Sequence, residues 1–205
     1  ATAVGTCQNR IVEKSFLRDN GLPHGPFAAI RCEDDIRNAD TSLFPAILKV
    51  ARFGYDGKGQ ATVHNVDEAL IAFGHFKGEH CVLEQRLTLD YEVSVVLARD
   101  QEGRVACFPT GENQHTRGIL DVSIVPARTT GCVRSDAEDV AARIAEKLGY
   151  IGTMGVEFFI SRGQLIVNEM APRPHNSGHY TIDACVTDQF EQQVRALCGL
   201  PLGEP

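Results

Sequence analysis

The chain has 205 residues, a net charge of −7 and 43% hydrophobic residues. This length and composition are typical of a globular protein that can bury a sizeable core. The negative charge argues against a broad nucleic-acid surface, because binding a polyphosphate backbone requires a basic face. No apolar run approaches the roughly 20 residues that span a bilayer, and no signal peptide is recognisable at Ala1. We therefore expect neither a nucleic acid nor a membrane as partner.

The first part of the chain predicts helices alternating with short strands. A helix is expected over residues 8–19, capped by Thr6 and ended by Asn20 and Gly21, which are common residues at helix ends. Further helices are expected over 34–40 and 66–76, strands over 27–31, 44–50 and 81–87, and a glycine-rich loop over 51–60.

The second part of the chain predicts several strand–turn–strand units. Strands are expected over 91–99, 104–110, 155–160 and 164–170, with helices over 187–198 and over 135–148, the latter capped by Ser135. This mixed order favours an α+β fold over regular strand–helix alternation around a parallel sheet. We expect a boundary near residues 84–88, with a first subdomain over about 1–86 and a second over about 87–205.

The seven cysteines are scattered along the chain without a CxxC pair. An odd number of unclustered cysteines matches neither a disulfide framework nor a zinc-binding pattern. The sequence therefore predicts reduced thiols in a cytoplasmic protein.

Lys49 interrupts an apolar strand just before a loop that contains Gly54, Gly57 and Gly59. A buried ammonium is costly unless it is paired or lies at the mouth of a cleft. Glycines at this spacing let successive N–H groups converge on an anion. The spacing differs from that of the P-loop NTPases. We predict a phosphate site, while an edge-strand lysine whose stem covers apolar surface stays possible.

Glu157 and Glu169 stand where apolar residues would be expected in two strands joined by a tight turn. Their positions pair within about one residue across the hairpin, and two close carboxylates repel unless a cation intervenes. Magnesium suits such all-oxygen ligation with few protein carboxylates, and Asn168 adds a neutral oxygen. The pair predicts a metal site, with two unrelated acids on a wet sheet face as the alternative.

A rigid polar loop follows Glu169 and contains Arg173, His175 and Asn176 between prolines. Such a loop presents donors to an anionic ligand, whereas Ser177 lacks the context of a nucleophile elbow. Upstream, Glu84 and Glu92 flank the expected boundary and are either nucleotide contacts or solvated strand glutamates.

Together these motifs resemble the ATP-grasp family, and within it the 5-(carboxyamino)imidazole ribonucleotide synthases of purine biosynthesis. The Asn-Ser-Gly-His sequence at 176–179 is similar to these synthases more than to their formate-using relatives. The resemblance rests on Gln8, Asn9 and Arg10 with Glu13 and Lys14, on the loop from Tyr55 to Gln60, on Glu112, Asn113 and His115, and on the segment from Asn168 to Ala184.

The resemblance implies a fold of two α+β subdomains that clamp a nucleotide, and it implies roles for individual residues. The ATP phosphates would contact Arg10, Lys49, Gly54, Tyr55, Asp56, Gly57, Lys58, Gly59 and Gln60. The adenine would be framed by Glu84, Gln85, Arg86 and Leu87, the ribose held by Glu92, and the nucleotide pocket lined by His115. Magnesium, or manganese, would bind Glu157 and Glu169 beside Asn168. Bicarbonate would contact Arg173, His175 and Asn176, and Tyr55 and Asp56 would also face the imidazole ribonucleotide.

The resemblance further implies an ATP-dependent carbon–nitrogen ligase. Bicarbonate would attack the γ-phosphate, and the resulting carboxyphosphate would carboxylate aminoimidazole ribonucleotide. The family suggests a homodimer and has further segments on both sides of the ATP-grasp part, so we expect a fragment with impaired turnover. Two alternatives stay open: a formate-dependent ligase similar to phosphoribosylglycinamide transformylase, and a non-catalytic nucleotide-binding module.

Overall fold

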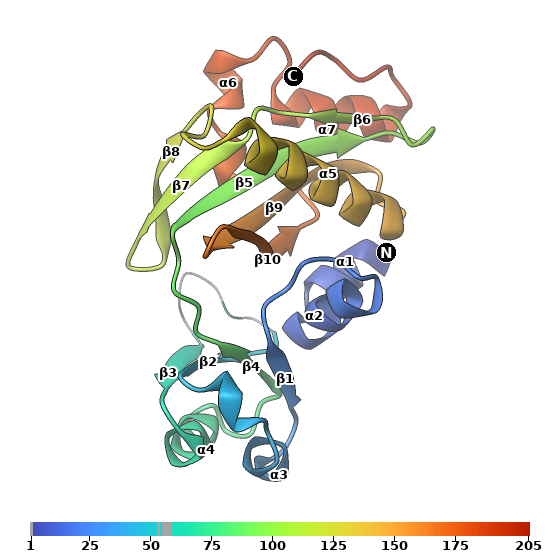
Figure 1. Cartoon of the computed structure of the whole chain (residues 1–205). Coiled ribbons are helices and arrows are strands. Elements are labelled where there is room, and N and C mark those ends of the chain that lie inside the picture. The colour runs from blue at the N-terminus through green and yellow to red at the C-terminus, as the bar shows by residue number, and fades with distance from the viewer. Residues whose placement is uncertain (1, 53, 55–58) are drawn as a thin grey trace. The chain divides into compact units, whose positions relative to one another are not determined.

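The computed structural model describes residues 2–52, 54 and 59–205. The chain forms two compact units. The small unit comprises Gln8–Thr88 with Arg117–Ile119, and the large unit comprises Ala1–Cys7, Leu89–Thr116 and Leu120–Pro205. Each unit has its own antiparallel sheet and its own helices (Figure 1).

The small unit is built on a four-stranded sheet in the order β1-β4-β2-β3. Its strands are β1 (Phe27–Ile30), β2 (Ala46–Val50), β3 (Gln60–Val63) and β4 (Cys81–Gln85). Its helices are α2 (Arg10–Asp19), α3 (Glu33–Arg37), the 3₁₀ turn η1 (Thr41–Leu43) and α4 (Val66–His75). The glycine-rich loop expected over 51–60 therefore ends earlier than predicted, because Gln60 already pairs with Lys49 in the sheet.

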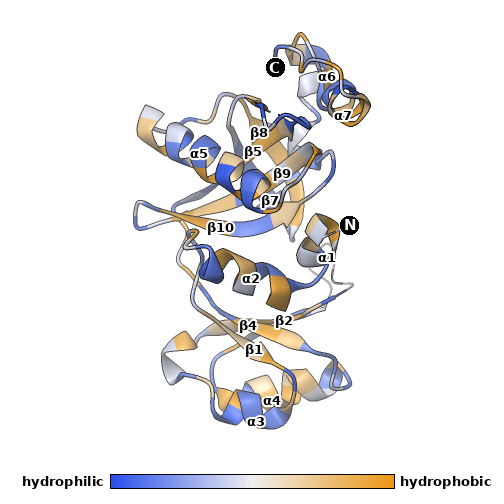
Figure 2. Cartoon of the chain, turned by 90° about the vertical axis from the view of Figure 1, so that its right-hand side faces the viewer, coloured by the Kyte–Doolittle hydropathy of each residue, from blue (hydrophilic) through white to orange (hydrophobic). Residues whose placement is uncertain are grey.

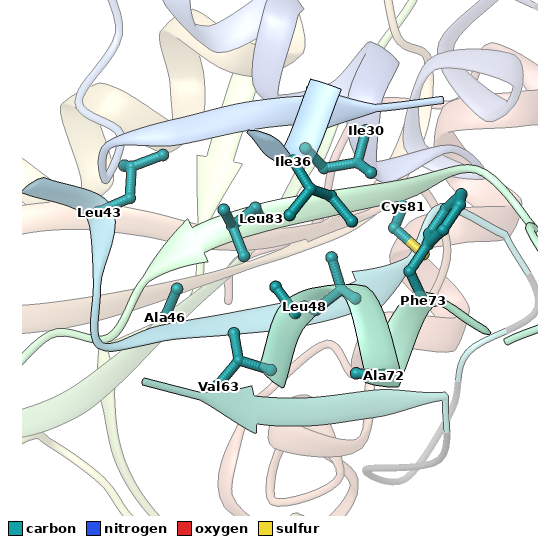
Figure 3. Close-up of a cluster of buried hydrophobic side chains, with 11 residues drawn as sticks. Ile30, Ile36, Leu43, Ala46, Leu48, Val63, Ala72, Phe73, Cys81 and Leu83 are labelled. Atoms are coloured by element: carbon teal, nitrogen blue, oxygen red, sulfur yellow. The ribbon is translucent and has the colours of Figure 1, made fainter. Parts of the chain in front are cut away.

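Alternation along β2 and β4 separates an apolar face from a polar one. Leu48 and Leu83 point into a core shared with α3 and α4, together with Ile36 and Phe73 (Figure 3). The side chains between them point to the opposite face, since successive strand residues alternate. Helix α2 lies over that opposite face (Figure 1) and packs Ile11 there against Val82 and Ala51.

The N-terminal helix differs from the expectation at its start. Helix α2 begins at Arg10, and its cap is Asn9, whose Oδ1 accepts hydrogen bonds from the backbone N–H groups of Ile11 at 3.0 Å and Val12 at 3.3 Å. The predicted cap at Thr6 is wrong, because Thr6 lies inside a separate helix, α1 (Thr2–Cys7), where its hydroxyl donates to the Thr2 carbonyl. Thr6 and Asn9 are both residue types that can cap a helix, and Asn9 is the one that directly precedes the first residue of α2.

The large unit contains a six-stranded sheet in the order β10-β9-β5-β7-β8, with β6 also paired to β5. The strands are β5 (Tyr91–Arg99), β6 (Val105–Cys107), β7 (Gly111–Thr116), β8 (Ile119–Ile124), β9 (Gly152–Ser161) and β10 (Gln164–Ala171). Its helices are α1, α5 (Gly131–Lys147), the 3₁₀ turn η2 (Asn176–Gly178), α6 (Thr181–Ala184) and α7 (Gln189–Cys198).

Helices α5 and α7 lie on opposite sides of this sheet (Figures 1 and 2). On the α5 side, Val156 and Phe158 of β9 are fully buried with Ile144. On the α7 side, the Thr153 hydroxyl donates to the Gln189 carbonyl at 3.0 Å. Helix α5 starts four residues before the predicted Ser135 cap; Thr130 is the cap, and its hydroxyl accepts from the Val133 N–H.

No helix among the described residues is both long and apolar enough to cross a membrane.

Candidate functional site

An acidic pair lies on the two strands at one edge of the large unit's sheet. Glu157 of β9 and Glu169 of β10 are direct partners in the antiparallel register. Opposite residues of neighbouring strands point to the same face, with Cβ atoms about 4.5–5.5 Å apart. The two-residue turn between the strands, Arg162 and Gly163, adopts positive φ angles of 51° and 73°. Such a turn fixes the register of the hairpin from Gln164 to Val167. Continued unchanged, that register would place Asn168 opposite Glu157, and a one-residue shift places Glu169 there instead.

A β-bulge brings Asn168 to the same place. The register shifts between Val167 and Glu169, so that Asn168 is the extra residue opposite Glu157. A bulge re-aims a side chain relative to the ordinary alternation of a strand. The Asn168 amide donates to Oε2 of Glu157 at 3.3 Å.

The acidic pair is electrostatically strained. Burial and the neighbouring charge of Glu169 raise the pKa of Glu157 to about 7, because desolvation and a like charge both disfavour the carboxylate. A divalent cation would relieve both effects. Among the described residues no group of three or more His, Cys, Asp or Glu side chains could hold a metal. Two carboxylates with an amide oxygen nearby fit magnesium, which keeps water and phosphate oxygens as its other ligands.

His175 is held against this pair by a rigid network. Its backbone N–H donates to Oε1 of Gln189 at 2.8 Å, and its carbonyl accepts from Nε2 of Gln189 at 2.9 Å. The ring nitrogen Nδ1 accepts from the Ser177 N–H at 3.3 Å and lies 2.9 Å from the Ser177 hydroxyl. Nε2 therefore carries the ring proton of the neutral imidazole, and it faces Oε1 of Glu157 at 3.6 Å.

The same surroundings keep His175 neutral. Burial, followed by the charge of Arg173, lowers the pKa of His175 to about 4. The contact between His175 and Glu157 is therefore no ion pair at neutral pH. His175 presents a fixed N–H donor beside the carboxylates.

Glu92 and His115 lie on the same sheet face as the acidic pair. Glu92 of β5 is the register partner of both Phe159 and Asn113, and His115 is two residues further along β7. Nδ1 of His115 lies 3.0 Å from Oε2 of Glu92. The hydrogen bond to Glu92 raises the pKa of His115, which outweighs its burial.

A basic cluster lies in the small unit, on the face of the sheet that α2 covers. Lys49 of β2 and Glu84 of β4 both point to this face, and their Nζ and Oε1 atoms are 3.1 Å apart. From α2, the Nζ atom of Lys14 reaches Oε2 of Glu84 at 3.3 Å. Arg10, one helical turn before Lys14, adds a third positive charge that acts on Glu84.

Burial and neighbouring charges act in opposite directions on the pKa values of Glu84 and Lys49. Burial alone would raise the pKa of Glu84, but Lys14 and Lys49 outweigh it and lower the pKa. Burial also lowers the pKa of Lys49, and the charge of Glu84 opposes that effect. The carboxylate of Glu84 is thus engaged by two ammonium groups, so its predicted contact with adenine would have to come from its backbone.

The other predicted site residues lie as follows. Gln85 donates through its side chain to the Ser42 carbonyl, Arg86 donates its N–H to the Pro45 carbonyl, and Leu87 follows them after β4. Arg173 and Asn176 are exposed on the loop that carries His175. Gly54, Gly59 and Gln60 are described, Gly59 with a φ of 72°. Tyr55, Asp56, Gly57 and Lys58 lie outside the described residues.

Three residues that support the site were not predicted from the sequence as site residues. Ser177 orients His175 from two positions away, Gln189 holds it from another helix, and Lys14 pairs with Glu84. Ser177 and Lys14 stand within the recognised motifs, so a search for buried polar partners near His175 and Arg10 could have found them. Gln189 gives no local signal.

A comparison with protein-family models matches residues 15–190 of the chain to the ATP-grasp domain. This match covers most of the chain and includes Lys49, Glu84, Glu157 and Glu169, whereas Arg10 and Lys14 lie just before it. The chain belongs to the ATP-grasp family. The predicted α+β, ATP-grasp fold is thereby confirmed.

Relatives and solved structures agree with this assignment. The chain is 42% identical over 199 residues to N5-carboxyaminoimidazole ribonucleotide synthase of Bacillus subtilis (strain 168), which covers 96% of this chain and 52% of that protein. A Staphylococcus aureus N5-carboxyaminoimidazole synthetase complexed with ADP has a TM-score of 0.92 and 38% identity, covering 99% of this chain and 54% of that one. The synthase of Aspergillus clavatus, in complex with ADP and 5-aminoimidazole ribonucleotide, has a TM-score of 0.88 and 26% identity, covering 98% and 54%. The chain spans about half the length of the curated relatives it matches.

Proposed function

We propose that this chain is the ATP-grasp part of an N5-carboxyaminoimidazole ribonucleotide synthase. In this reaction ATP phosphorylates bicarbonate, and the activated carboxyl group is transferred to the amine of 5-aminoimidazole ribonucleotide. The relatives that carry this name and the solved complexes with ADP and with the imidazole ribonucleotide support the assignment. The observation that carries it is the direct register pairing of Glu157 and Glu169 beside a neutral His175 donor.

The small unit supplies the positive charge that phosphates need. Lys49 and Arg10 belong to the cluster in which Lys14, Lys49 and Arg10 act on the carboxylate of Glu84. Phosphoryl transfer needs positioning and charge neutralisation more than covalent side-chain chemistry. We assign Lys49 and Arg10 to the ATP phosphates, and the segment after β4, including Gln85, Arg86 and Leu87, to the adenine through backbone groups.

The large unit supplies the metal ligands and the bicarbonate site. Glu157 and Glu169 would hold a magnesium ion, which when bound screens the negative charge of the phosphate oxygens. His175, with its proton on Nε2, donates a hydrogen bond to an oxyanion without changing its own charge. Arg173 adds a cation on the same loop, and Asn176 adds an amide. These groups hold bicarbonate in place while one of its oxygens attacks the γ-phosphate and negative charge moves onto the leaving ADP.

Substitution of the acidic pair tests this assignment. Glu157→Gln and Glu169→Gln keep the shape of the side chain and remove one charge each. We expect magnesium-dependent ATP binding, measured by calorimetry with and without magnesium, to weaken at least about tenfold, since even residues outside the direct ligand set typically affect metal affinity 10- to 100-fold. Glu146→Gln, on the exposed side of α5, is the matched control and should leave binding unchanged.

The outcomes separate the proposal from its alternatives. ATP binding that ignores both magnesium and these substitutions would indicate a non-catalytic nucleotide module and refute the metal assignment. Release of phosphate that depends on formate and not on bicarbonate would refute the substrate. Phosphate release that depends on bicarbonate, and on Glu157 and Glu169, supports both the metal assignment and bicarbonate as the substrate.

A further inference from the structure

Lys14 is the most deeply buried charged residue of the basic cluster. Its side chain is 2% exposed, whereas those of Lys49 and Glu84 are each 12% exposed. An ammonium at this depth is costly unless a carboxylate compensates it. Its Nζ lies 3.3 Å from Oε2 of Glu84, so the compensation is direct.

The two lysines divide the Glu84 carboxylate between them. Lys49 approaches Oε1 at 3.1 Å from the neighbouring strand, and Lys14 approaches Oε2 from the helix. A carboxylate held at both oxygens by two cations cannot rotate without breaking one contact. Lys14 therefore fixes the orientation of Glu84, and Glu84 in turn fixes the position of the Lys49 ammonium.

Lys14 sits where the sequence and the fold both support this role. Its register in α2, one turn after Arg10 and three residues after the buried Ile11, points it at β4. Lys49 lies at the more exposed side of the cluster, closer to solvent than Lys14. The geometry thus separates a cation that can reach a ligand from one that supports it.

We propose that Lys14 is a positioning residue of the phosphate-binding site, which acts through Glu84 to hold Lys49 where the ammonium meets the phosphate tail of ATP. This inference rests on the proposed function. Lys14 is too buried to contact a ligand itself. Its role is to position the cluster, whereas Lys49 contacts the nucleotide.

The test compares nucleotides with and without phosphates. Lys14→Met keeps an unbranched side chain of similar reach and removes the charge, while Lys14→Arg keeps the charge. The affinities of ATP and adenosine are measured on the whole chain by competition with a fluorescent ATP analogue. Lys147→Met, at an exposed position of α5, is the matched control.

We expect Lys14→Met to weaken the affinity for ATP about tenfold, which corresponds to about 1.4 kcal/mol, and to change the affinity for adenosine by no more than about twofold. We expect Lys14→Arg to recover at least half of the lost ATP affinity on a logarithmic scale. Equal losses of ATP and adenosine, or no loss of ATP, would overturn the inference. If Lys14→Met does not fold, Lys14→Gln, which also removes the charge, carries the test: a selective loss of ATP affinity supports the proposal, and an equal loss for both ligands or no loss overturns it. A wild-type chain that binds no ATP would instead refute the proposed function, and this inference with it.

Discussion

The contact between Gly155 and His175 allows a direct test of how tightly the loop that carries His175 packs against β9 in the large unit. A Cβ added at Gly155 would lie 2.6 Å from Cβ and 2.8 Å from Cγ of His175. Those atoms are next to the backbone of His175, so they cannot swing away as the tip of a long side chain could. We therefore predict that Gly155→Ala displaces the loop that carries His175.

The size of the effect follows from the distances. Carbon atoms pack at about 3.5–4.0 Å, so the loop must move by roughly 1 Å. His175 is held by two backbone hydrogen bonds with Gln189, at 2.8 and 2.9 Å, which such a shift stretches. Overpacking of this kind typically costs about 1–3 kcal/mol, and we expect a destabilisation in that range.

Urea denaturation measures the change, with Gly131→Ala as the matched control. A Cβ at Gly131, the first residue of α5, meets nothing within 4 Å, so this variant should be neutral or slightly stabilising. If Gly155→Ala unfolds at the same urea concentration as the wild type with an unchanged slope, the loop is not held as tightly as the contacts imply and the reasoning is wrong.

Two further predictions concern protonation away from the acidic pair. The buried carboxylate of Asp100 accepts from two backbone N–H groups and from Arg104; burial opposes its ionisation, but the hydrogen bonds from Arg104 outweigh it and lower the pKa below the ordinary 3.8. Its stabilising contribution is therefore complete above the unfolded-state pKa and is lost as pH falls through the folded one, so the stability gap between wild type and Asp100→Asn should shrink from pH 5 to pH 3; a gap independent of pH contradicts this. Burial raises the pKa of both Cys81 and Cys107 to about 12, so in the native protein at pH 8 these two should react with a thiol reagent far more slowly than the exposed cysteines, and one common rate for all would contradict the burial. The exposed cysteines are Cys32, Cys132 and Cys198.

Local sequence was sufficient where a short segment fixes its own geometry. The turn at Arg162 and Gly163 sets the β9–β10 register as far as Val167, so the approach of Glu157 and Glu169 to within one residue followed from the sequence. The bulge at Asn168, which makes them direct partners, did not. The alternation of β2 likewise placed Lys49 away from the apolar core. Strand β7 was missed because it reads Gly-Glu-Asn-Gln-His-Thr. Such a polar strand lacks the apolar alternation that marks a half-buried sheet.

The sequence by itself determined the family, the α+β class and the residue types of both clusters, because these depend on motifs and on neighbours along the chain. The tertiary structure decided which partners those residues meet. Gln189 of helix α7 holds the loop that carries His175, and Lys14 of helix α2 contacts one oxygen of the Glu84 carboxylate on β4. These contacts join segments far apart in sequence, and their energies depend on burial and distance, which no local pattern encodes.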